Sequence, residues 1–370
     1  MTRCIVIVLL VFAAWPGHAR SPAEDACRPP PVRLDPAPIV AVEGPAHKGT
    51  DRRIEPFALL QMESAAAWRG SRDEDAAARA VASLLRWARA GALSEIVDAG
   101  PGSSNTNSIY SLRRALIAML GAWMELRHTP AGRAHADEIE RWLSRLVVLQ
   151  DVNTGGKKRR ARGEAMSNRN NHALLRATVA AQWAVLTGRG EYADAAEEAT
   201  RAAIAGMDAD GSLPLEMERG PRALWYQRHA IASLVYIAEL LRPFGHDLWR
   251  PRSDGADLHR AVDFLLDAID DPRRLAAFTG ADADRQDLGF LVPRGNGRHY
   301  MAWAELYRAR FPERPESMRL LSRLPARGDR GWPLIDDYVG GNATCRVLTE
   351  APPPSLRSAG PPLRSGGRAN

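Results

Sequence analysis

The sequence predicts an all-α protein made of antiparallel helix pairs. Apolar residues recur three and four positions apart along most of the chain, which is the period of a helix with one buried face. The sequence has no long alternation of apolar and polar residues, so we expect no sizeable sheet. The chain has 370 residues, 45% of them hydrophobic, and can therefore bury one large core or two ordinary ones.

The expected helices alternate with turn signals such as "AGPGSSNTN", "TGRG", "DADGSLP" and "RPFGHD". Helices of ordinary length joined by short loops are typical of stacked antiparallel pairs, which close into a toroid or continue as an open solenoid. The absence of a repeat of fixed period favours the toroid. Helical periodicity predicts helices at 57–69, 75–91, 110–127, 133–150, 171–187, 191–206, 222–242, 256–270 and 299–311.

The N-terminus has the pattern of a secretory signal peptide. Arg3 precedes an apolar stretch from Cys4 to Trp15, and the small residues Gly17 and Ala19 provide a cleavage site after Ala19. The apolar stretch is too short to span a bilayer. We therefore expect export to the periplasm and no membrane insertion after cleavage; an uncleaved N-terminal anchor is the alternative.

Proline marks both ends of the expected mature chain. The string "CRPPPVRLDPAPIVAVEGPAHKG" cannot sustain a helix, because proline removes a backbone donor and clashes with the preceding turn. The string "APPPSLRSAGPPLRSGGRAN" has the composition of a disordered segment. We divide the chain into a signal peptide (1–19), a proline-rich leading segment (20–55), an α/α-toroid domain (56–348) and a disordered tail (349–370).

Cysteine content and charge indicate the surroundings of the mature protein. Cys27 and Cys345 remain after signal cleavage and can either form one disulfide or stay as two free thiols, since the sequence does not fix their separation. The formal net charge of the whole chain is +6. An exported basic protein meets no genome, so we expect an acidic envelope partner, such as a polyuronate or a membrane surface, and no nucleic acid.

Several catalytic classes lack their motifs in this sequence. It contains no H-E-x-x-H, no G-x-S-x-G, no C-x-x-C and no complete Walker motif. The nine histidines are scattered, with no pair at helical ligand spacing. We therefore expect no dedicated metal site.

The stretch "SNRNNHALLRATVAAQW" places Asn170, Asn171 and His172 directly before a run typical of a buried helix. Asparagine is a good N-cap residue, so capping accounts for one of the three. Two amides and an imidazole at one helix end are more than a cap requires, and we consider all three as candidate site residues.

A second candidate group lies on the helix expected at 222–242. Arg222, Tyr226 and His229 are at positions i, i+4 and i+7, which places them along one helix face. A cation beside two groups that can transfer protons suits chemistry on an acidic sugar. The same spacing also suits a tyrosine and a histidine half-buried between helices with an arginine at the rim.

A basic run leads into the first candidate group. Such a run is usually a solvated loop, but this one could gather a polyanion for a site that follows directly. It consists of Lys157, Lys158, Arg159, Arg160 and Arg162.

At these residues the sequence resembles the alginate lyases of polysaccharide lyase family 5, the periplasmic mannuronate-specific lyases. The order and approximate spacing of the matching segments extend from about residue 60 to residue 345. The resemblance implies an incomplete α/α barrel, or toroid, with a long groove for the polymer. Its specific segments are "NNH" (170–172) and "DADGSLPLEMERGPRAL" (208–224), supported by "RWARAGAL" (86–93), "EIERWLSRL" (138–146) and "AWAELY" (302–307).

The resemblance implies catalytic roles for Asn171, His172 and Arg222. In β-elimination the C5 proton is removed, negative charge develops at the uronate carboxylate, and the glycosidic oxygen leaves from C4. Asn171 and Arg222 would neutralise the carboxylate, and preorganised donors of this kind can contribute several kcal/mol. His172 would act as a base or as a further donor. Because side chains neutralise the carboxylate, the reaction would need no calcium and no other cofactor.

One position departs from the family pattern. The family has a tyrosine as proton donor seven residues after the arginine, where this chain has His229; Tyr226, one turn earlier, matches a second family tyrosine. Activity can persist with a changed acid, move to another polyuronate, or be lost. The residues expected to bind substrate are Asn170, Trp87, Lys157, Lys158, Arg159 and Arg160.

We predict an exported polysaccharide lyase that cleaves mannuronate-rich alginate or a related polyuronate by β-elimination, with His229 or Tyr226 transferring the proton. One alternative is a polyuronate-binding or export-assembly protein that kept the groove and lost the acid. The other is a glycoside hydrolase on the same toroid, which needs two opposed carboxylic acids. Glu216 and Glu218 are the acids beside the motif.

Overall fold

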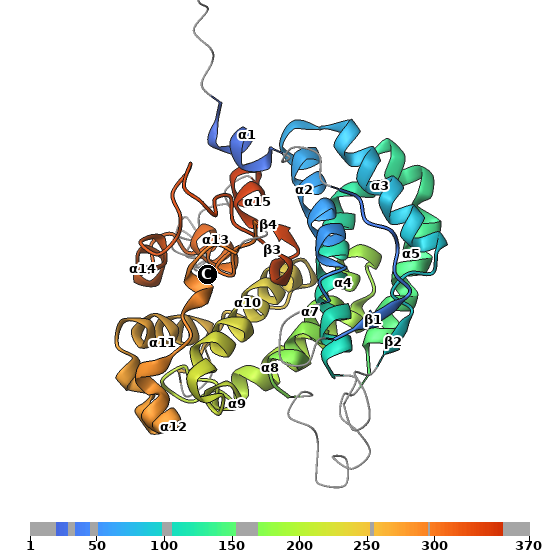
Figure 1. Cartoon of the computed structure of the whole chain (residues 1–370). Helices are drawn as coiled ribbons and strands as arrows, with labels where there is room; N and C mark the ends of the chain where they lie inside the picture. The colour runs from blue at the N-terminus through green and yellow to red at the C-terminus, as the bar shows by residue number, and fades with distance from the viewer. Residues whose placement is uncertain are drawn as a thin grey trace, which may run out of the picture.

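The computed structural model describes residues 20–28, 34–44, 51–97, 106–152, 169–251, 255–294 and 297–350. The predicted signal peptide, nearly all of the predicted tail and the basic run lie outside these residues. Within them, no helix combines the length and the apolar character needed to cross a membrane. Figure 1 shows a largely helical molecule with only very short strands.

All nine helices predicted from periodicity are present, and their ends differ from the predicted ends by four residues at most. The helix predicted at 171–187 has those bounds in the structure. The observed elements are α2 (Glu55–Ser71), α3 (Glu74–Arg89), α4 (Thr106–Leu126), α5 (Pro130–Gln150), α7 (Asn171–Thr187), α8 (Gly190–Ala205), α10 (Ala223–Leu241), α11 (Leu258–Asp270) and α13 (Trp303–Arg310).

Shorter elements connect these helices. The leading segment contains a helix that we did not predict, in which Ser21 forms a capping box and Pro22 occupies the first turn. Strand β1 (Ala41–Glu43) pairs in parallel with β2 (Glu95–Val97), and β3 (Ile335–Asp336) pairs antiparallel with β4 (Gly341–Asn342). The remaining elements that the text uses are α1 (Pro22–Cys27), α9 (Pro214–Met217), α14 (Pro315–Leu321), α15 (Ala343–Thr349), and the 3₁₀ turns η2 (Gly220–Arg222) and η7 (Asp337–Val339).

The helix pairs build an α/α toroid, as predicted. Helices α2, α4, α7 and α10 contact one another in succession, and α3, α5, α8 and α11 pack against them (Figure 1). Helices α4 and α10 are buried along most of their length, because they contact neighbours on several sides. This burial includes Arg113, Arg114 and Arg228, whose charges must find partners inside the fold.

The C-terminal part of the chain returns to α4 at the turn η7. A side chain at Gly121 of α4 would overlap the carbonyl oxygen of Gly340, and Gly340 has a φ of 68°, which favours glycine. Two glycines therefore allow η7 to lie directly against α4. This contact brings residues 337–339 next to helices that precede them by more than a hundred positions.

A disulfide joins the two ends of the described chain. Cys27 of α1 and Cys345 of α15 are bonded, with Cα atoms 4.8 Å apart. Of the two alternatives that the sequence left open, a disulfide or two free thiols, the disulfide is present. The two cysteines pack with Ala26 and Ala66 in a small buried cluster on α2. The bridge is consistent with a non-reducing compartment.

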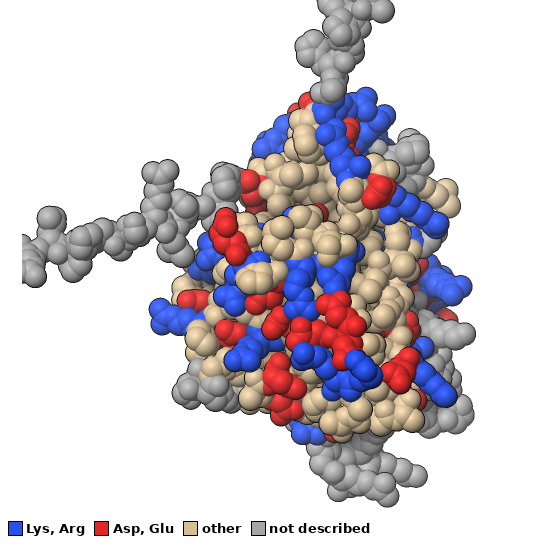
Figure 2. Space-filling model, turned by 90° about the vertical axis from the view of Figure 1, so that its left-hand side faces the viewer, with Lys and Arg blue, Asp and Glu red and all other residues tan. Residues whose placement is uncertain are grey.

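The face formed by α11 and α14 carries charges of both signs. Figure 2, which turns the left side of Figure 1 toward the viewer, shows Lys and Arg interleaved with Asp and Glu. Arg319 of α14, for example, forms ion pairs with Asp263, Asp267 and Asp270 of α11 at 2.7–2.9 Å. Basic residues on this face are therefore largely matched by acids and do not form a patch of one sign.

Candidate active site

The first turn of α7 uses Asn170 as its cap. The Asn170 Oδ1 accepts a hydrogen bond from the backbone N–H of His172 at 3.1 Å, and the backbone N–H of Asn171 donates to Glu216 Oε1 at 2.7 Å. These bonds satisfy donors that a helix N-terminus leaves free. Capping thus accounts for Asn170, while the side chains of Asn171 and His172 remain available for other contacts.

The Asn171 side chain lies between α7 and α10. It is 1% exposed, and its Nδ2 is 3.5 Å from His229 Nδ1. Its Oδ1 has no hydrogen-bond partner among the described residues. A buried amide oxygen without a protein partner is costly and is the exception in folded proteins.

His172 is half-buried at the same helix end. Its ring centroid is 5.0 Å from that of Tyr110 on α4. Burial lowers the pKa of the imidazole to about 3, and the positive charges of Arg113 and Arg219 lower it further in the same direction. The ring is therefore neutral near pH 7, with one nitrogen that donates and one that accepts hydrogen bonds.

Glu216 of α9 accepts the hydrogen bond from the backbone N–H of Asn171. Its side chain is 2% exposed, and burial raises the pKa of the carboxyl to about 7, against the opposing effects of the Asn171 hydrogen bond and Arg219. Its Oε2 has no hydrogen-bond partner among the described residues. Glu218, two residues later, is exposed.

A cavity of about 1030 Å³ lies between α5, α7 and α8, and Asn170 and Glu216 form part of its wall. Its lining does not include Asn171, His172 or Tyr226. The cavity therefore borders the rear of the candidate site and is not where the reactive side chains meet.

Arg219 lies beside the other candidate groups, whereas Arg222, which we assigned from the sequence, does not. Arg222 is exposed and belongs to the 3₁₀ turn before α10, with φ −111° and ψ 13°, so it does not continue the face of that helix. The Arg219 guanidinium carbon lies 4.5 Å from the ring centroid of Tyr226, and its charge acts on both His172 and Glu216. The sequence contains a signal for this pair: Tyr226 is seven positions after Arg219, which is the spacing between the arginine and the tyrosine in the family pattern.

Tyr226 and His229 differ strongly in their surroundings. Tyr226 is half-buried, and its ring centroid is 5.6 Å from that of His229. His229 is 4% exposed, and burial together with Arg228 and Arg114 holds the pKa of its imidazole well below the usual range. His229 is therefore uncharged, and a charged imidazolium that could donate its proton does not fit this environment.

Comparisons with known proteins identify the family of this chain. A family model described as alginate lyase matches residues 18–275. An alginate lyase of Pseudomonas aeruginosa is 31% identical over 284 residues, which are 75% of this chain and 68% of that protein. A polysaccharide lyase of Stenotrophomonas maltophilia is 30% identical over 210 residues, 57% of this chain and 56% of the other.

The chain belongs to the alginate lyase family. It is accordingly a polysaccharide lyase. Among solved structures, a His-to-Ala variant of alginate lyase A1-III in complex with a tetrasaccharide is similar in fold, with a TM-score of 0.72, 23% identity and 91% of each chain covered. An alginate lyase from Bacteroides ovatus gives a TM-score of 0.55 at 16% identity, covering 74% of this chain and 71% of the other.

The substrate-binding residues that we predicted for this alginate lyase family member are Trp87 and the basic residues at 157–160, in addition to Asn170. Trp87 is 0% exposed, stacks on Phe57 with centroids 3.8 Å apart, and donates from Nε1 to the Pro36 carbonyl at 3.3 Å. It is a core residue and is not placed to contact a polymer, because its side chain is enclosed by the protein. The predicted binding residues Lys157, Lys158, Arg159 and Arg160 lie outside the described residues.

The glycoside hydrolase alternative is not supported. It required two opposed carboxylic acids. Glu216 is bound to the backbone of Asn171, and Glu218 is exposed to solvent on the same short segment. Family membership excludes it independently, since the relatives are lyases.

One group outside the site has metal-type ligands. In the described part of the chain, Asp194, Glu197 and His246 each offer an atom within 4.8 Å of the others. The two ring nitrogens of His246 face different carboxylates, at 2.7 Å from Glu197 and 3.6 Å from Asp194, and Glu197 also pairs with Arg201. Contacts of the imidazole with the two carboxylates, together with the ion pair between Glu197 and Arg201, account for this arrangement.

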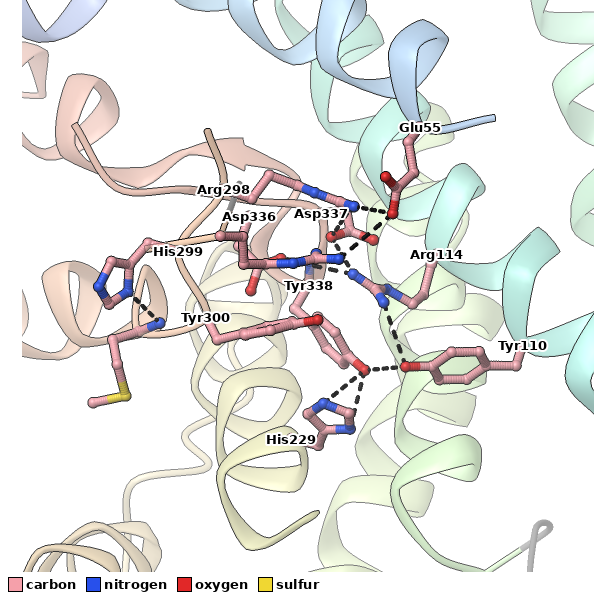
Figure 3. Close-up of polar contacts among 12 residues, drawn as sticks. Glu55, Tyr110, Arg114, His229, Arg298, His299, Tyr300, Asp336, Asp337 and Tyr338 are labelled. Atoms are coloured by element: carbon pink, nitrogen blue, oxygen red, sulfur yellow. Dashed lines mark hydrogen bonds and ion pairs between the residues drawn. The ribbon is translucent and has the colours of Figure 1, made fainter. Parts of the chain in front are cut away.

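Residues that sequence reasoning missed form a series of contacts that extends from His229 to Glu55 (Figure 3). They come from α2, α4, the segment before α13, and η7, and several lie beyond residue 275, where the family match ends. Their polar contacts form one continuous network, in which Glu55 and Tyr110 are half-buried and the other members are buried. Its members are Glu55, Tyr110, Arg114, His229, Arg298, Asp337 and Tyr338.

Proposed function

We propose that this protein cleaves mannuronate-rich alginate or a related polyuronate by β-elimination, after export to the periplasm. The main support is that four side chains from three segments lie close together. They are Asn171 and His172 of α7, Arg219 between α9 and η2, and Tyr226 of α10. An amide, a cation, a neutral imidazole and a phenol are the groups that elimination next to a carboxylate needs. The disulfide supports a location outside a reducing compartment.

The relatives support the same substrate class. The P. aeruginosa relative is an alginate lyase, and alginate lyase A1-III has been solved with a tetrasaccharide. Variants of A1-III replace a histidine and a tyrosine that are 54 positions apart in that chain. Fifty-four positions also separate His172 from Tyr226 in this sequence. This spacing supports Tyr226, in preference to His229, as the proton-transfer residue.

In the proposed mechanism Asn171 and Arg219 neutralise the carboxylate of the uronate at the cleaved bond. The Asn171 Nδ2 carries two hydrogens, so it can face His229 and still donate one hydrogen bond to the substrate. Arg219 adds a positive charge next to the carboxylate, and both groups act where negative charge develops in the transition state. Because its pKa is about 3, His172 would donate a hydrogen bond to the same carboxylate instead of acting as a base.

Tyr226 would exchange the protons. As a phenolate it removes the C5 proton, and the phenol then returns that proton to the glycosidic oxygen that leaves from C4. The Arg219 guanidinium above its ring would stabilise the negative charge on the phenolate. The product is an unsaturated sugar that absorbs in the near ultraviolet.

The experiment incubates the mature protein with several polyuronates and follows that absorbance. A lyase produces it, a hydrolase gives reducing ends without it, and a binding protein gives neither. Tyr226→Phe should abolish turnover while the melting temperature stays close to that of the wild type. If Tyr226→Phe stays active and His229→Gln does not, the roles that we give to these two residues are reversed.

A further inference from the structure

Tyr338 contacts the site from a part of the chain that lies beyond the family match. It belongs to η7, is 0% exposed, and packs its ring 4.6 Å from the ring of His229, centroid to centroid. Its hydroxyl oxygen is 3.0 Å from His229 Nδ1, 3.2 Å from His229 Nε2 and 2.6 Å from the hydroxyl of Tyr110 (Figure 3).

Two hydroxyl groups connect Arg114 to His229 through hydrogen bonds. Arg114 can only donate, so its Nη1 donates to the Tyr110 hydroxyl at 3.5 Å. The Tyr110 and Tyr338 hydroxyls share a hydrogen bond in which either oxygen can donate. A neutral imidazole has one nitrogen that donates and one that accepts, and the Tyr338 hydroxyl lies within reach of both. Burial keeps the pKa of Tyr338 well above its ordinary value and that of His229 well below, so the phenol retains its proton and the imidazole retains a free lone pair.

Buried ion pairs hold η7 in position. Asp337, the neighbour of Tyr338, binds Arg114 of α4 and Arg298, with 2.9 Å from Arg298 Nη1 to Asp337 Oδ1. Arg298 in turn binds Glu55 at the start of α2. Three segments distant in sequence thus fix the backbone beside Tyr338. The position of its hydroxyl is therefore set by the fold and not by a mobile side chain.

We propose that Tyr338 is a positioning residue, which orients His229 and through it the amide of Asn171. His229 Nδ1 lies 3.0 Å from the Tyr338 hydroxyl and 3.5 Å from Asn171 Nδ2, so one ring links the two groups. Fixing the ring fixes which way the Asn171 amide faces and hence where it donates. The proposal rests on the proposed function, in which this amide neutralises the substrate carboxylate.

The test compares Tyr338→Phe with Tyr307→Phe. Tyr307 is a matched control, because it is also buried and its hydroxyl is 2.8 Å from Nδ1 of a histidine, His259, outside the site. Both variants should lower the melting temperature by a similar amount, because each removes one buried hydroxyl that is hydrogen-bonded to a histidine. Only Tyr338→Phe should lower kcat, by about tenfold, with KM changed by less than about twofold.

Three kinetic results would overturn the proposal. They are an unchanged kcat in Tyr338→Phe, an equal loss of kcat in both variants, and a raised KM at constant kcat, which would make Tyr338 a binding residue.

A measurement without substrate separates this proposal from the proposed function. Nitrogen-15 NMR of the histidine ring nitrogens reports hydrogen bonding at His229, whose signals are identified by their loss in His229→Gln. Tyr338→Phe should shift the His229 signals, and Tyr307→Phe should leave them in place. Unchanged His229 signals in Tyr338→Phe would refute the hydrogen bond even if the wild type proved inactive on every polyuronate. Shifted signals with an inactive wild type would instead refute the proposed function.

Discussion

Replacing Glu216 with glutamine should remove a large part of the pH dependence of stability. The carboxyl is nearly fully buried, its Oε1 accepts from the backbone N–H of Asn171, and its Oε2 has no hydrogen-bond partner among the described residues. In Glu216→Gln the amide oxygen can still accept that hydrogen bond, while the ionisable group is lost. The variant therefore changes charge with little change in shape.

The size of the effect follows from the pKa of this carboxyl, which burial raises from 4.5 to about 7. A raised pKa means that the folded state holds the proton more tightly than the unfolded state. The resulting stability is fully present below the unfolded pKa and is lost as pH rises through the folded pKa. From about pH 5 to about pH 8, the wild type should lose about 2.5 kcal/mol through this group, and the variant should not.

Urea unfolding followed by circular dichroism measures the free energy of unfolding of both proteins across this pH range. His172 and His229, whose lowered pKa values change stability in the opposite direction, titrate in both proteins and cancel in the difference. The control is Glu218→Gln, which makes the same substitution at an exposed neighbouring residue. Its stability should follow that of the wild type across the pH range. A difference between wild type and Glu216→Gln that stays constant with pH would refute the reasoning.

Three further predictions concern the site cation, the disulfide and the basic run. Arg219→Ala should reduce kcat/KM by about a hundredfold or more, and Arg222→Ala, on the exposed turn, should leave it nearly unchanged; the opposite order would restore the assignment made from sequence. Replacing Cys27 and Cys345 with serine should lower the free energy of unfolding by about 2 to 4 kcal/mol in denaturant titrations, and equal stability of the two proteins would show that the bridge does not constrain the unfolded chain. Serine at positions 157–160 should weaken polymer binding most at low salt, and a salt-independent affinity would leave the run no role in binding.

The sequence by itself determined the helical framework and half of the site. Helix boundaries follow from local rules, namely apolar spacing, capping residues and turn formers, and these rules act over a few residues. The pair Asn171 and His172 was recognisable for the same reason, because its position at a helix start is a local feature and capping left it unexplained. Tyr226 was also visible, as a phenol on a helix with an arginine close in sequence.

Only the tertiary structure decided which charges and protons these residues carry and what surrounds them. Arg222 lies on an exposed 3₁₀ turn while Arg219 lies against Tyr226. Burial and neighbouring arginines keep His229 uncharged. Tyr338 reaches His229 across 109 positions, a distance at which no local pattern carries information. Burial, electrostatic fields and long-range hydrogen bonds depend on how the helices pack, and packing is a property of the whole chain.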